Sequence, residues 1–248
     1  MTNDTELLAR IQELEAQLAT AHAEQWKLIR DVCHELRLPL TSMKGYTDLM
    51  PLIGPINDQQ KDFVSRIKKN ITRMSGMITN LHDLAYMGEG KFKLKPKELP
   101  TAQLVQEVCD EMQLVAKERQ NTLRCDLPGD LPHVYADEER AKQSLRIMIE
   151  NACWYTPAGG QATVNAEASG DSMVKISVSD TGVGVPEAER AKLFSLFFRA
   201  DLELVRGQAG AGMNLYMLRR FVELMGGSYG ADFAAEGGSR FWVCLPAR

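Results

Sequence analysis

The sequence predicts an α+β protein in which a helical hairpin precedes a two-layer α/β sandwich. Two long amphipathic helical patterns occupy the first third of the chain, and shorter helical patterns alternate with strands after residue 90. Because the two long helices have apolar faces and nothing else to cover them, they are expected to dimerise into a four-helix bundle. Helices interleaved with mainly antiparallel strands are typical of one sheet covered by one helical layer.

The composition fits two small globular domains. The 248 residues are 44% hydrophobic and 25% charged, and a net charge of −4 gives no electrostatic reason to expect nucleic acid or an acidic membrane surface. No run of 18 apolar residues is present, and Met1–Asp4 carry no basic or apolar signal region, so no membrane segment or secretion signal is expected. Scattered cysteines without a C-x-x-C pair indicate a reducing cytosol and argue against zinc. They are Cys33, Cys109, Cys125, Cys153 and Cys244.

The first long helix is predicted between about Thr5 and Met50. Its first part has a heptad seam, with charged and polar residues in the positions between: Leu7, Ile11, Leu14, Leu18, Ala21, Gln25, Leu28 and Val32. A seam of about four heptads with no globular sequence before it favours a parallel coiled coil over a lone amphipathic helix on a globular core. Pro51, Gly54 and Pro55 are expected to break this helix.

A second helical pattern lies between about Asp58 and Met87, and Gly88–Lys91 follows it as the expected hinge. The apolar positions of this helix are Phe63, Ile67, Ile71, Met74, Met77, Ile78, Leu81 and Leu84. The expected division is a coiled-coil lead-in, a helical-hairpin domain and a sandwich domain, over residues 1–22, 23–90 and 91–248.

The elements of the sandwich follow from periodicity and turn residues. Helices are expected over residues 101–119, 137–155 and 213–225. Strands are expected over residues 122–127, 133–135, 161–168, 173–179, 228–233 and 239–245.

His34 is the candidate catalytic residue of the hairpin. It lies in the run V-C-H-E-L-R-L-P-L-T at residues 32–41, about 180° around the helix from the centre of an apolar stripe, so its imidazole is expected to face solvent. The stripe consists of Leu28, Val32, Leu36, Leu40 and Met43. A surface histidine needs no function by itself. The run, however, resembles the phospho-acceptor box of two-component sensor histidine kinases, in which the histidine attacks the γ-phosphate of ATP.

Three glycine-bearing clusters are candidate ligand-binding loops. Asp180–Pro186 follows a strand that would deliver a carboxylate, and its glycines let the backbone approach a ligand. Gly207–Gly212 opens a helix, where free N–H groups and the helix dipole favour phosphate. A plain turn would also explain the first cluster, and the third, Gly237–Ser239, could be only a hairpin turn.

The order of these features resembles the ATPase domain of histidine kinases, the Bergerat-type nucleotide fold. A lone Asn151 is more often a cap or surface residue, but here it precedes Asp-x-Gly-x-Gly, a phenylalanine cluster at residues 193–201 and Gly-x-Gly before a helix. These match the N, G1, F and G2 boxes of that family. The run V-Y-A-D at residues 134–137 matches the approach to the N-box helix, and the resemblance extends from about Ala23 to the C-terminus.

The resemblance implies how phosphoryl transfer is carried out. His34 would be the nucleophile, and Glu35 would polarise or deprotonate it; a neutral imidazole beside a carboxylate also suits this chemistry by itself. Asn151 would coordinate Mg²⁺ through its amide oxygen, while waters and phosphate oxygens complete the coordination.

The resemblance also implies the nucleotide contacts. Asp180 would accept a hydrogen bond from the adenine amino group, and Tyr155 would lie against the base. The remaining residues of the adenine pocket would be Gly182 and Gly184. Phosphates would be held at the base of a lid over residues 199–212 by Gly210 and Gly212, with Arg199 approaching them when the lid closes.

The chain departs from the family pattern at three positions. Ile147 stands where the N box usually has Asn, Trp154 where it usually has Lys or His, and Leu38 where a Thr or Asn commonly follows the histidine. The first two changes affect the Mg²⁺–phosphate end of the pocket. The other histidines lie in no motif and are interpreted as surface or core residues: His22, His82 and His133.

The sequence is therefore identified as the catalytic portion of a sensor histidine kinase. The resemblance implies a homodimer that binds ATP and Mg²⁺, phosphorylates His34 and passes the phosphoryl group to an aspartate on the receiver domain of a response regulator. An upstream sensor domain or protein and a cytoplasmic location, on its own or as the cytosolic part of a larger sensor, are expected. The alternative is a degenerate pseudokinase that acts as a dimeric scaffold, for which Ile147 and Trp154 are the evidence. An ATP-hydrolysing machine of the same superfold is a less favoured alternative, because its general-base carboxylate would be expected at the position of Ile147.

Overall fold

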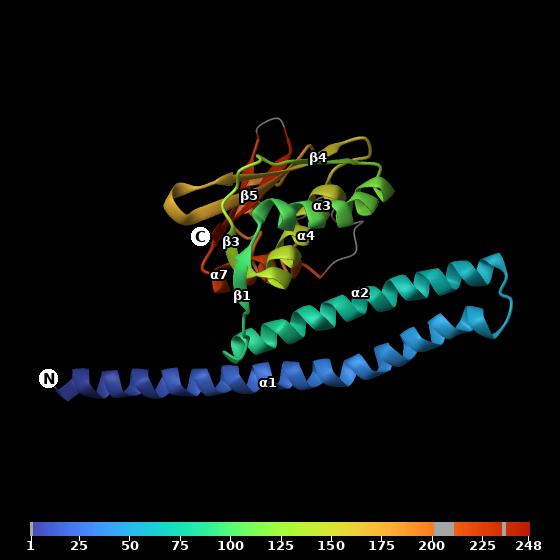
Figure 1. The fold of residues 1–248 in the computed structure, drawn as a ribbon. Coiled ribbons are helices and arrows are strands. Elements are labelled where there is room, and N and C mark those ends of the chain that lie inside the picture. Colours follow the sequence, from blue (N-terminus) through green and yellow to red (C-terminus); the bar gives the residue numbers. More distant parts are fainter. Residues whose placement is uncertain (1, 201–210, 235–236) are drawn as a thin grey trace. The chain divides into compact units, whose positions relative to one another are not determined.

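The structure is a computed structural model that describes residues 2–200, 211–234 and 237–248. The chain divides into two compact units, Met1–Lys93 and Leu94–Arg248. The first unit is helical, and the second combines helices with a sheet (Figure 1). None of the helices in the described parts of the chain is long and apolar enough to cross a membrane.

The helical unit is an antiparallel hairpin of α1 (Thr2–Ile53) and α2 (Asp58–Gly88) (Figure 1). The expected break over Pro51, Gly54 and Pro55 is confirmed, since α1 ends directly before Gly54, but the helix continues through Pro51 to Ile53. A proline so close to a helix end removes only one hydrogen bond of the last turn, so the chain can finish that turn before it reverses. The second helix begins at a capping box, in which Asn57 Oδ1 accepts a hydrogen bond from the Gln60 N–H at 2.8 Å.

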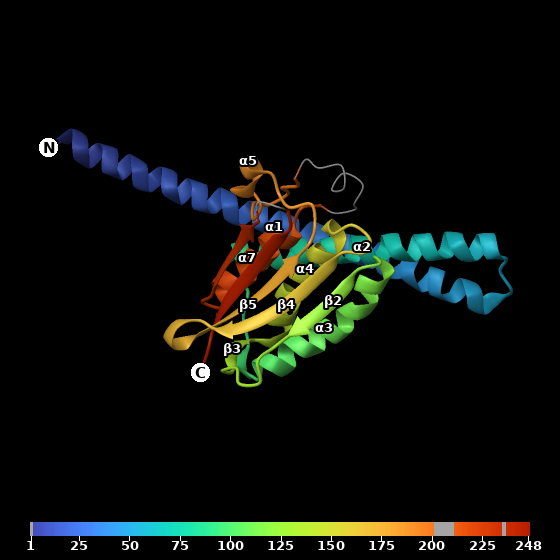
Figure 2. The same cartoon turned by 90° about the horizontal axis from the view of Figure 1, so that it is seen from above.

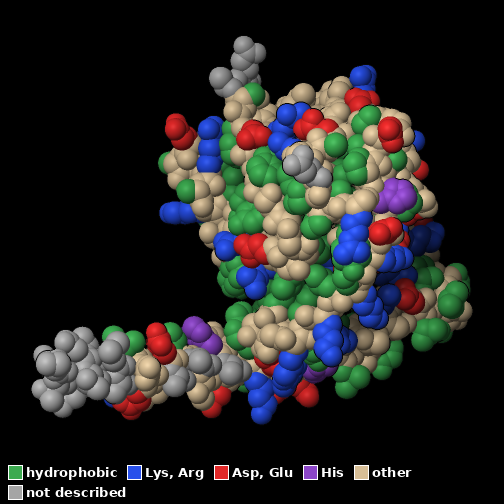
Figure 3. All heavy atoms as spheres, turned by 60° about the vertical axis from the view of Figure 1, so that its left-hand side comes forward, with side chains coloured by type: hydrophobic (Ala, Val, Ile, Leu, Met, Phe, Trp, Pro, Cys, Tyr) green, Lys and Arg blue, Asp and Glu red, His purple; other side chains and the backbone are tan. Residues whose placement is uncertain are grey.

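The hairpin buries only part of its apolar surface. Cys33 and Leu40 of α1 pack against Ile71 and Ile78 of α2. The expected single stripe on α1 is therefore divided, because of its five members only Leu40 is buried. The apolar residues of α1 and α2 that remain exposed include Ile11, Leu14, Leu18, Leu28, Val32, Leu36, Met43, Phe63, Ile67 and Met74. Hydrophobic side chains open to solvent are visible on the helical unit in Figure 3.

The open end of the hairpin is joined by a charged and an aromatic contact. Arg30 Nη1 donates hydrogen bonds to both carboxylate oxygens of Glu89, each at 2.6 Å. The Trp26 ring lies against Gly88, where a Cβ atom would collide with it. These contacts align the C-terminal end of α2 with the part of α1 that directly precedes His34.

The second unit is a two-layer sandwich, as predicted. Its five-stranded sheet has the order β2-β4-β5-β7-β6, in which only the β2–β4 pair is parallel. The strands are β2 (Thr122–Asp126), β4 (Gln161–Ala168), β5 (Met173–Asp180), β6 (Ser228–Phe233) and β7 (Ser239–Pro246). One face of the sheet is covered by α3 (Thr101–Glu118), α4 (Glu138–Tyr155) and α7 (Asn214–Leu224) (Figure 2).

The short elements β1 (Pro96–Leu99) and α5 (Glu187–Arg190) were among those not predicted from the sequence. The strand β1 pairs antiparallel with β3 (Val134–Asp137) outside the main sheet. A single helical turn, α5, follows the loop after β5. The core between the layers is formed by large side chains of the central helices and strands: Leu145, Met148, Ile149, Val164, Ile176, Met217, Leu218 and Phe221.

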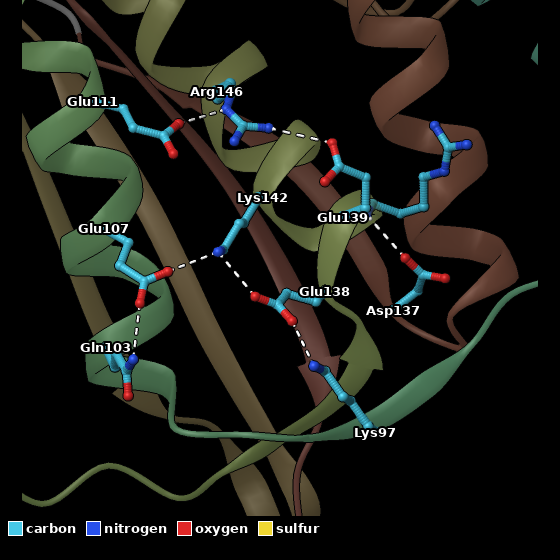
Figure 4. A network of polar contacts seen from close by, with 10 residues as sticks. Lys97, Gln103, Glu107, Glu111, Asp137, Glu138, Glu139, Lys142 and Arg146 are labelled. Atoms are coloured by element: carbon cyan, nitrogen blue, oxygen red, sulfur yellow. Dashed lines mark hydrogen bonds and ion pairs between the residues drawn. The ribbon is translucent and has the colours of Figure 1, made fainter.

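An ion-pair network holds α4 beside α3 (Figure 4). Lys142 lies 2.7 Å from Glu107 of α3 and 2.9 Å from Glu138 of its own helix, and Arg146 lies 2.8 Å from Glu111. Both contacts from α4 to α3 join residues 35 positions apart, so the helices run parallel in a fixed register. Exposed pairs stabilise little individually, but this register positions the helix that carries the predicted N box. In the view of Figure 3, basic and acidic side chains are interspersed over the surface of the α/β unit.

Candidate functional site

Asp180 ends the central strand β5 and has its two carboxylate oxygens in different environments. Oδ1 accepts hydrogen bonds from the Gly182 N–H at 2.8 Å and the Ser239 N–H at 3.2 Å. Within the described parts of the chain, no donor reaches Oδ2. Burial raises the pKa of Asp180, and the two backbone hydrogen bonds oppose this rise. A half-buried carboxylate held at one oxygen and open at the other is suited to accept a hydrogen bond from a ligand amino group.

Glycines allow three backbone segments to meet around Asp180. A Cβ atom on Gly182 would lie 2.5 Å from the Tyr155 carbonyl oxygen and 2.6 Å from Asp180 Oδ1. The Tyr155 oxygen accepts a hydrogen bond from the Val183 N–H at 3.2 Å, and the Gly182 oxygen accepts one from the Gly238 N–H at 2.9 Å. The end of α4, the loop after β5 and the turn before β7 are thus in direct contact. The Gly237–Ser239 cluster, whose role the sequence left open, belongs to this site.

The helix α4 presents Asn151 and Tyr155, one turn apart, beside this loop. Asn151 is half-buried, and in the part of the chain that the structure describes its amide has no hydrogen-bond partner. Burial raises the pKa of Tyr155, which the positive charge of Arg199 opposes, so the structure brings Arg199 into the vicinity of this ring. Ile147 is buried in the core and offers no polar atom to a ligand.

Trp154 carries a cation on its ring. The Arg119 guanidinium carbon lies 4.0 Å from the centroid of the Trp154 ring, at a separation at which a cation is attracted to an indole face. Arg119 is the C-cap of α3. It precedes Trp154 by 35 positions, the same separation as in the two ion pairs between α3 and α4. Sequence reasoning missed Arg119 because no local motif marks it, and only the parallel register of α3 and α4 brings it to Trp154.

The phenylalanine cluster contacts the glycine before α7. Gly212 has a φ of +69°, and a Cβ atom there would lie 2.5 Å from the Phe198 carbonyl oxygen. Gly184 also has a positive φ, +68°, a conformation that glycine adopts without strain. The Gly212 contact brings together the two ends of the predicted lid. Gly210 and the rest of residues 201–210 lie outside the described residues.

His34 is exposed on α1, as predicted, and its neighbour Glu35 is exposed as well. The ring of His34 nevertheless has a neighbour, because the His82 ring of α2 lies 5.1 Å away, centroid to centroid, at 84°. The Tyr86 ring lies 4.6 Å beyond His82 on the same helix. Interpreting His82 without reference to His34 missed this pair, since the two residues are 48 positions apart and only the hairpin joins them.

The predicted site residues thus belong to two groups. Asn151, Tyr155, Asp180, Gly182 and Gly184 lie together in the α/β unit. Arg199 and Gly212 extend that group, whereas His34 and Glu35 belong to the helical unit.

Comparison with known families matches both units. Residues 25–90 match the His Kinase A (phospho-acceptor) domain. Residues 136–248 match the histidine kinase-, DNA gyrase B-, and HSP90-like ATPase family. Among solved structures, the chain resembles full-length ShkA in complex with AMPPNP, with 26% identity and a TM-score of 0.77 over 89% of this chain and 46% of that one. AdeS of Acinetobacter baumannii shares the fold at 18% identity and a TM-score of 0.61, over 87% of this chain and 98% of that one.

The similar curated proteins are kinases of the same kind. The circadian input-output histidine kinase CikA of Synechococcus elongatus is 30% identical over 252 residues, 99% of this chain and 33% of CikA. The adaptive-response sensory kinase SasA of Synechococcus sp. (strain CC9311) is 31% identical over 246 residues, 98% of this chain and 62% of SasA. The chain therefore belongs to the sensor histidine kinases, and it spans less than two thirds of either relative.

Replacing Asp180 with Asn is expected to weaken ATP binding by about ten- to a hundredfold, since a hydrogen bond to a charged acceptor contributes roughly 1.5–3 kcal/mol. Because the pKa of Asp180 is raised in the folded protein, its charged form disfavours folding once the pH exceeds the ordinary aspartate value. Asp180→Asn should therefore melt no lower than the wild type at neutral pH. Calorimetric titration measures the ATP affinity and thermal melts measure the melting temperature, with Asp232→Asn, at an exposed position, as the control. Equal ATP affinity of Asp180→Asn and the wild type would show that Asp180 does not contact the nucleotide.

Replacing Gly182 with Ala is expected to impair folding and nucleotide binding together, because the new methyl group would collide with the Tyr155 carbonyl and Asp180. Overpacking of this kind costs about 1–3 kcal/mol of the free energy of unfolding. Gly129→Ala is the control, since nothing lies within 4 Å of a Cβ atom there. Urea denaturation should separate the two variants, and the same midpoint for both would contradict the proposed close approach.

Proposed function

We propose that the chain is the core of a sensor histidine kinase that transfers the γ-phosphoryl group of ATP to His34 and then to an aspartate of a response regulator. Residues 23–90 would be the dimerisation and phosphotransfer domain, after a coiled coil over 1–22, and residues 91–248 would bind ATP. The location that suits this function is the cytoplasm.

The observation that carries this proposal is the environment of Asp180. Its Oδ1 is held by two backbone N–H groups, while Oδ2, which no donor among the described residues reaches, would accept a hydrogen bond from the adenine amino group. Tyr155 would lie against the base, and Gly182 and Gly184 keep side chains away from it. Because the Asp180 carboxylate is already held in place, little free energy is lost in orienting it when the adenine amino group binds.

The phosphate end would be formed by the glycines before α7 and by nearby cations. Gly210 and Gly212 precede the helix, where N–H groups and the helix dipole attract phosphate. Arg199 would approach the phosphates from the other end of the same lid. Arg119, stacked on Trp154, adds positive charge near the end of α4.

Asn151 fits a magnesium ligand. Its half-buried amide has no partner among the described residues, and Mg²⁺ prefers oxygen ligands and takes most of them from phosphates and water. A bound Mg²⁺ would neutralise phosphate charge and join the nucleotide to α4. Ile147 contributes nothing to this set, so Asn151 would be the single N-box ligand.

The phosphoryl transfer would proceed on the neutral imidazole of His34. One ring nitrogen donates its lone pair to the γ-phosphorus, and the N–P bond forms as the P–O bond to ADP breaks. The proton on the other ring nitrogen passes to the Glu35 carboxylate. In the second step Glu35 returns the proton to the other ring nitrogen, the N–P bond breaks as a receiver aspartate oxygen binds the phosphorus, and His34 regains its lone pair as a neutral imidazole.

The protein would act as a homodimer, fed by an upstream sensor domain or protein. The exposed apolar residues of α1 and α2 have no partner in the described hairpin. A second copy would cover them in a four-helix bundle, extended by the heptad seam of α1.

His34→Gln is expected to abolish autophosphorylation while leaving ATP affinity unchanged, because the acceptor and the nucleotide-binding residues belong to different units. Incubation with ATP labelled at the γ-phosphate should give an acid-labile, alkali-stable label in the wild type. His22→Gln, an exposed histidine on the same helix, should label normally. Persistent labelling of His34→Gln would place the phosphoryl group on another residue.

Light scattering at micromolar concentration should give twice the chain mass. Ile67→Asp should weaken this dimer, because it places a charge on the exposed apolar face of α2. Leu114→Asp is the matched control, since Leu114 is an exposed apolar residue of α3 in the other unit. A monomeric wild type would rule out the bundle.

A further inference from the structure

His82 is the only described side chain whose ring contacts that of His34. The two rings meet edge to face, 5.1 Å apart, across the α1–α2 interface. The His82 side chain is only 19% exposed, whereas His34 belongs to the exposed surface of α1. The Tyr86 ring also lies 4.6 Å from the His82 ring, centroid to centroid. The ring of His82 thus contacts both Tyr86 and the residue proposed to receive the phosphoryl group.

The two nitrogens of His82 differ in their surroundings. Nδ1 lies 3.9 Å from Asp83 Oδ1, and a nearby carboxylate favours the proton on that nitrogen. Nε2 is buried, and within the described residues it has no hydrogen-bond partner. A buried polar atom without a partner is costly and calls for an explanation. An apolar side chain would pack at this position without that cost.

The charged and titratable groups around His82 come from both helices. On α1 they are His34 and Arg37, and on α2 they are Asp83 and Tyr86. Burial lowers the pKa of His82, the positive charge of Arg37 and the neighbouring His34 lower it further, and Asp83 opposes them. The imidazole of His82 is therefore neutral at neutral pH, and Nε2 offers a lone pair on the side of the ring away from Asp83.

We propose that His82 is a positioning residue for phosphoryl transfer, whose neutral ring holds the His34 imidazole in one orientation at the hairpin surface. The inference rests on the proposed role of His34 as phospho-acceptor. An exposed histidine rotates freely about its side-chain bonds, while in-line attack requires one nitrogen to face the γ-phosphorus. Edge-to-face packing against a ring that is itself fixed restricts this rotation.

The roles of His82 and Glu35 are different. Glu35 follows His34 on the exposed face of α1 and makes no hydrogen bond within the described residues, so it is free to take the proton. His82 contacts the ring itself. Protonation of His82 would place a cation beside Arg37 and draw the ring towards Asp83, and the contact with His34 would weaken. The proposal therefore predicts that the rate of phosphoryl transfer falls at acidic pH because His82 becomes protonated.

The test compares autophosphorylation of the whole chain with that of His82→Ala and His82→Phe over a range of pH. His82→Ala should lower kcat by about ten- to a hundredfold, the effect of poor positioning of a reacting group, with the KM for ATP unchanged. His82→Phe keeps a ring beside His34 and should restore most of the rate at neutral pH. It should also lose activity less steeply than the wild type at acidic pH, because one titrating group has been removed.

A spectroscopic measurement on the unmodified protein supports or overturns the proposal without relying on the variants. Proton NMR should show a nuclear Overhauser effect between the His34 and His82 rings, and the His34 ring resonances should shift as His82 titrates. Absence of the nuclear Overhauser effect between the two rings, or a kcat for His82→Ala equal to that of the wild type, would overturn the proposal. If His82→Ala fails to fold, the wild-type spectrum and the pH profile of His82→Phe decide.

Failure of the proposed function would look different. Labelling that survives in His34→Gln would show that His34 is not the acceptor, whatever the His82 variants do. Labelling confined to His34 together with normal kinetics in His82→Ala would leave the kinase intact and remove only the role of His82.

Discussion

The proposed nucleotide site depends on one constraint, which is that three backbone segments meet at Asp180 with no side chain between them. The register of β5 with β7 places Asp180 opposite Ser239, and the Ser239 N–H becomes one of the two donors to Oδ1. Gly182 supplies the other donor and, lacking a Cβ atom, lets the loop touch the end of α4. Any larger residue at Gly182 would separate the carboxylate from α4, and thereby from Asn151 and Tyr155.

The helical unit has the opposite requirement, because its proposed phospho-acceptor His34 must stay accessible. Only one side of α1 faces α2, through Cys33 and Leu40. Val32 and Leu36 remain exposed on another side, so a stable hairpin needs a second apolar surface against them. His34 lies beside the interface with α2 without being buried in it. Cover of that second side by another copy, as proposed, would leave His34 accessible on a third side of a helix packed on two.

Periodicity and motif spacing predicted the hairpin, the sandwich and the cluster around Asp180, because these follow from local pattern and chain order. The errors and omissions have a common physical origin. Pro51 affects only the last turn of α1, where few hydrogen bonds remain to be lost. The four-residue strand β1 is too short for a pattern and exists through its pairing with β3. Arg119 and His82 acquire their meaning from contacts 35 and 48 residues away, which a register between helices creates and a linear motif does not record.

The two units use burial for opposite electrostatic ends. In its proposed role Asp180 has to remain an ionised acceptor although burial favours its neutral form, and two backbone N–H groups limit the rise of its pKa. The proposed positioning role of His82 needs its neutral form, and burial together with the positive charge of Arg37 lowers the pKa of His82. In the first case hydrogen bonds from the rigid end of a sheet preserve a charge, while in the second a buried interface removes one beside the proposed nucleophile. The proposed phosphoryl transfer needs both conditions at the same pH, because an ionised Asp180 would accept a hydrogen bond from the base while a neutral His34 imidazole would attack the phosphorus.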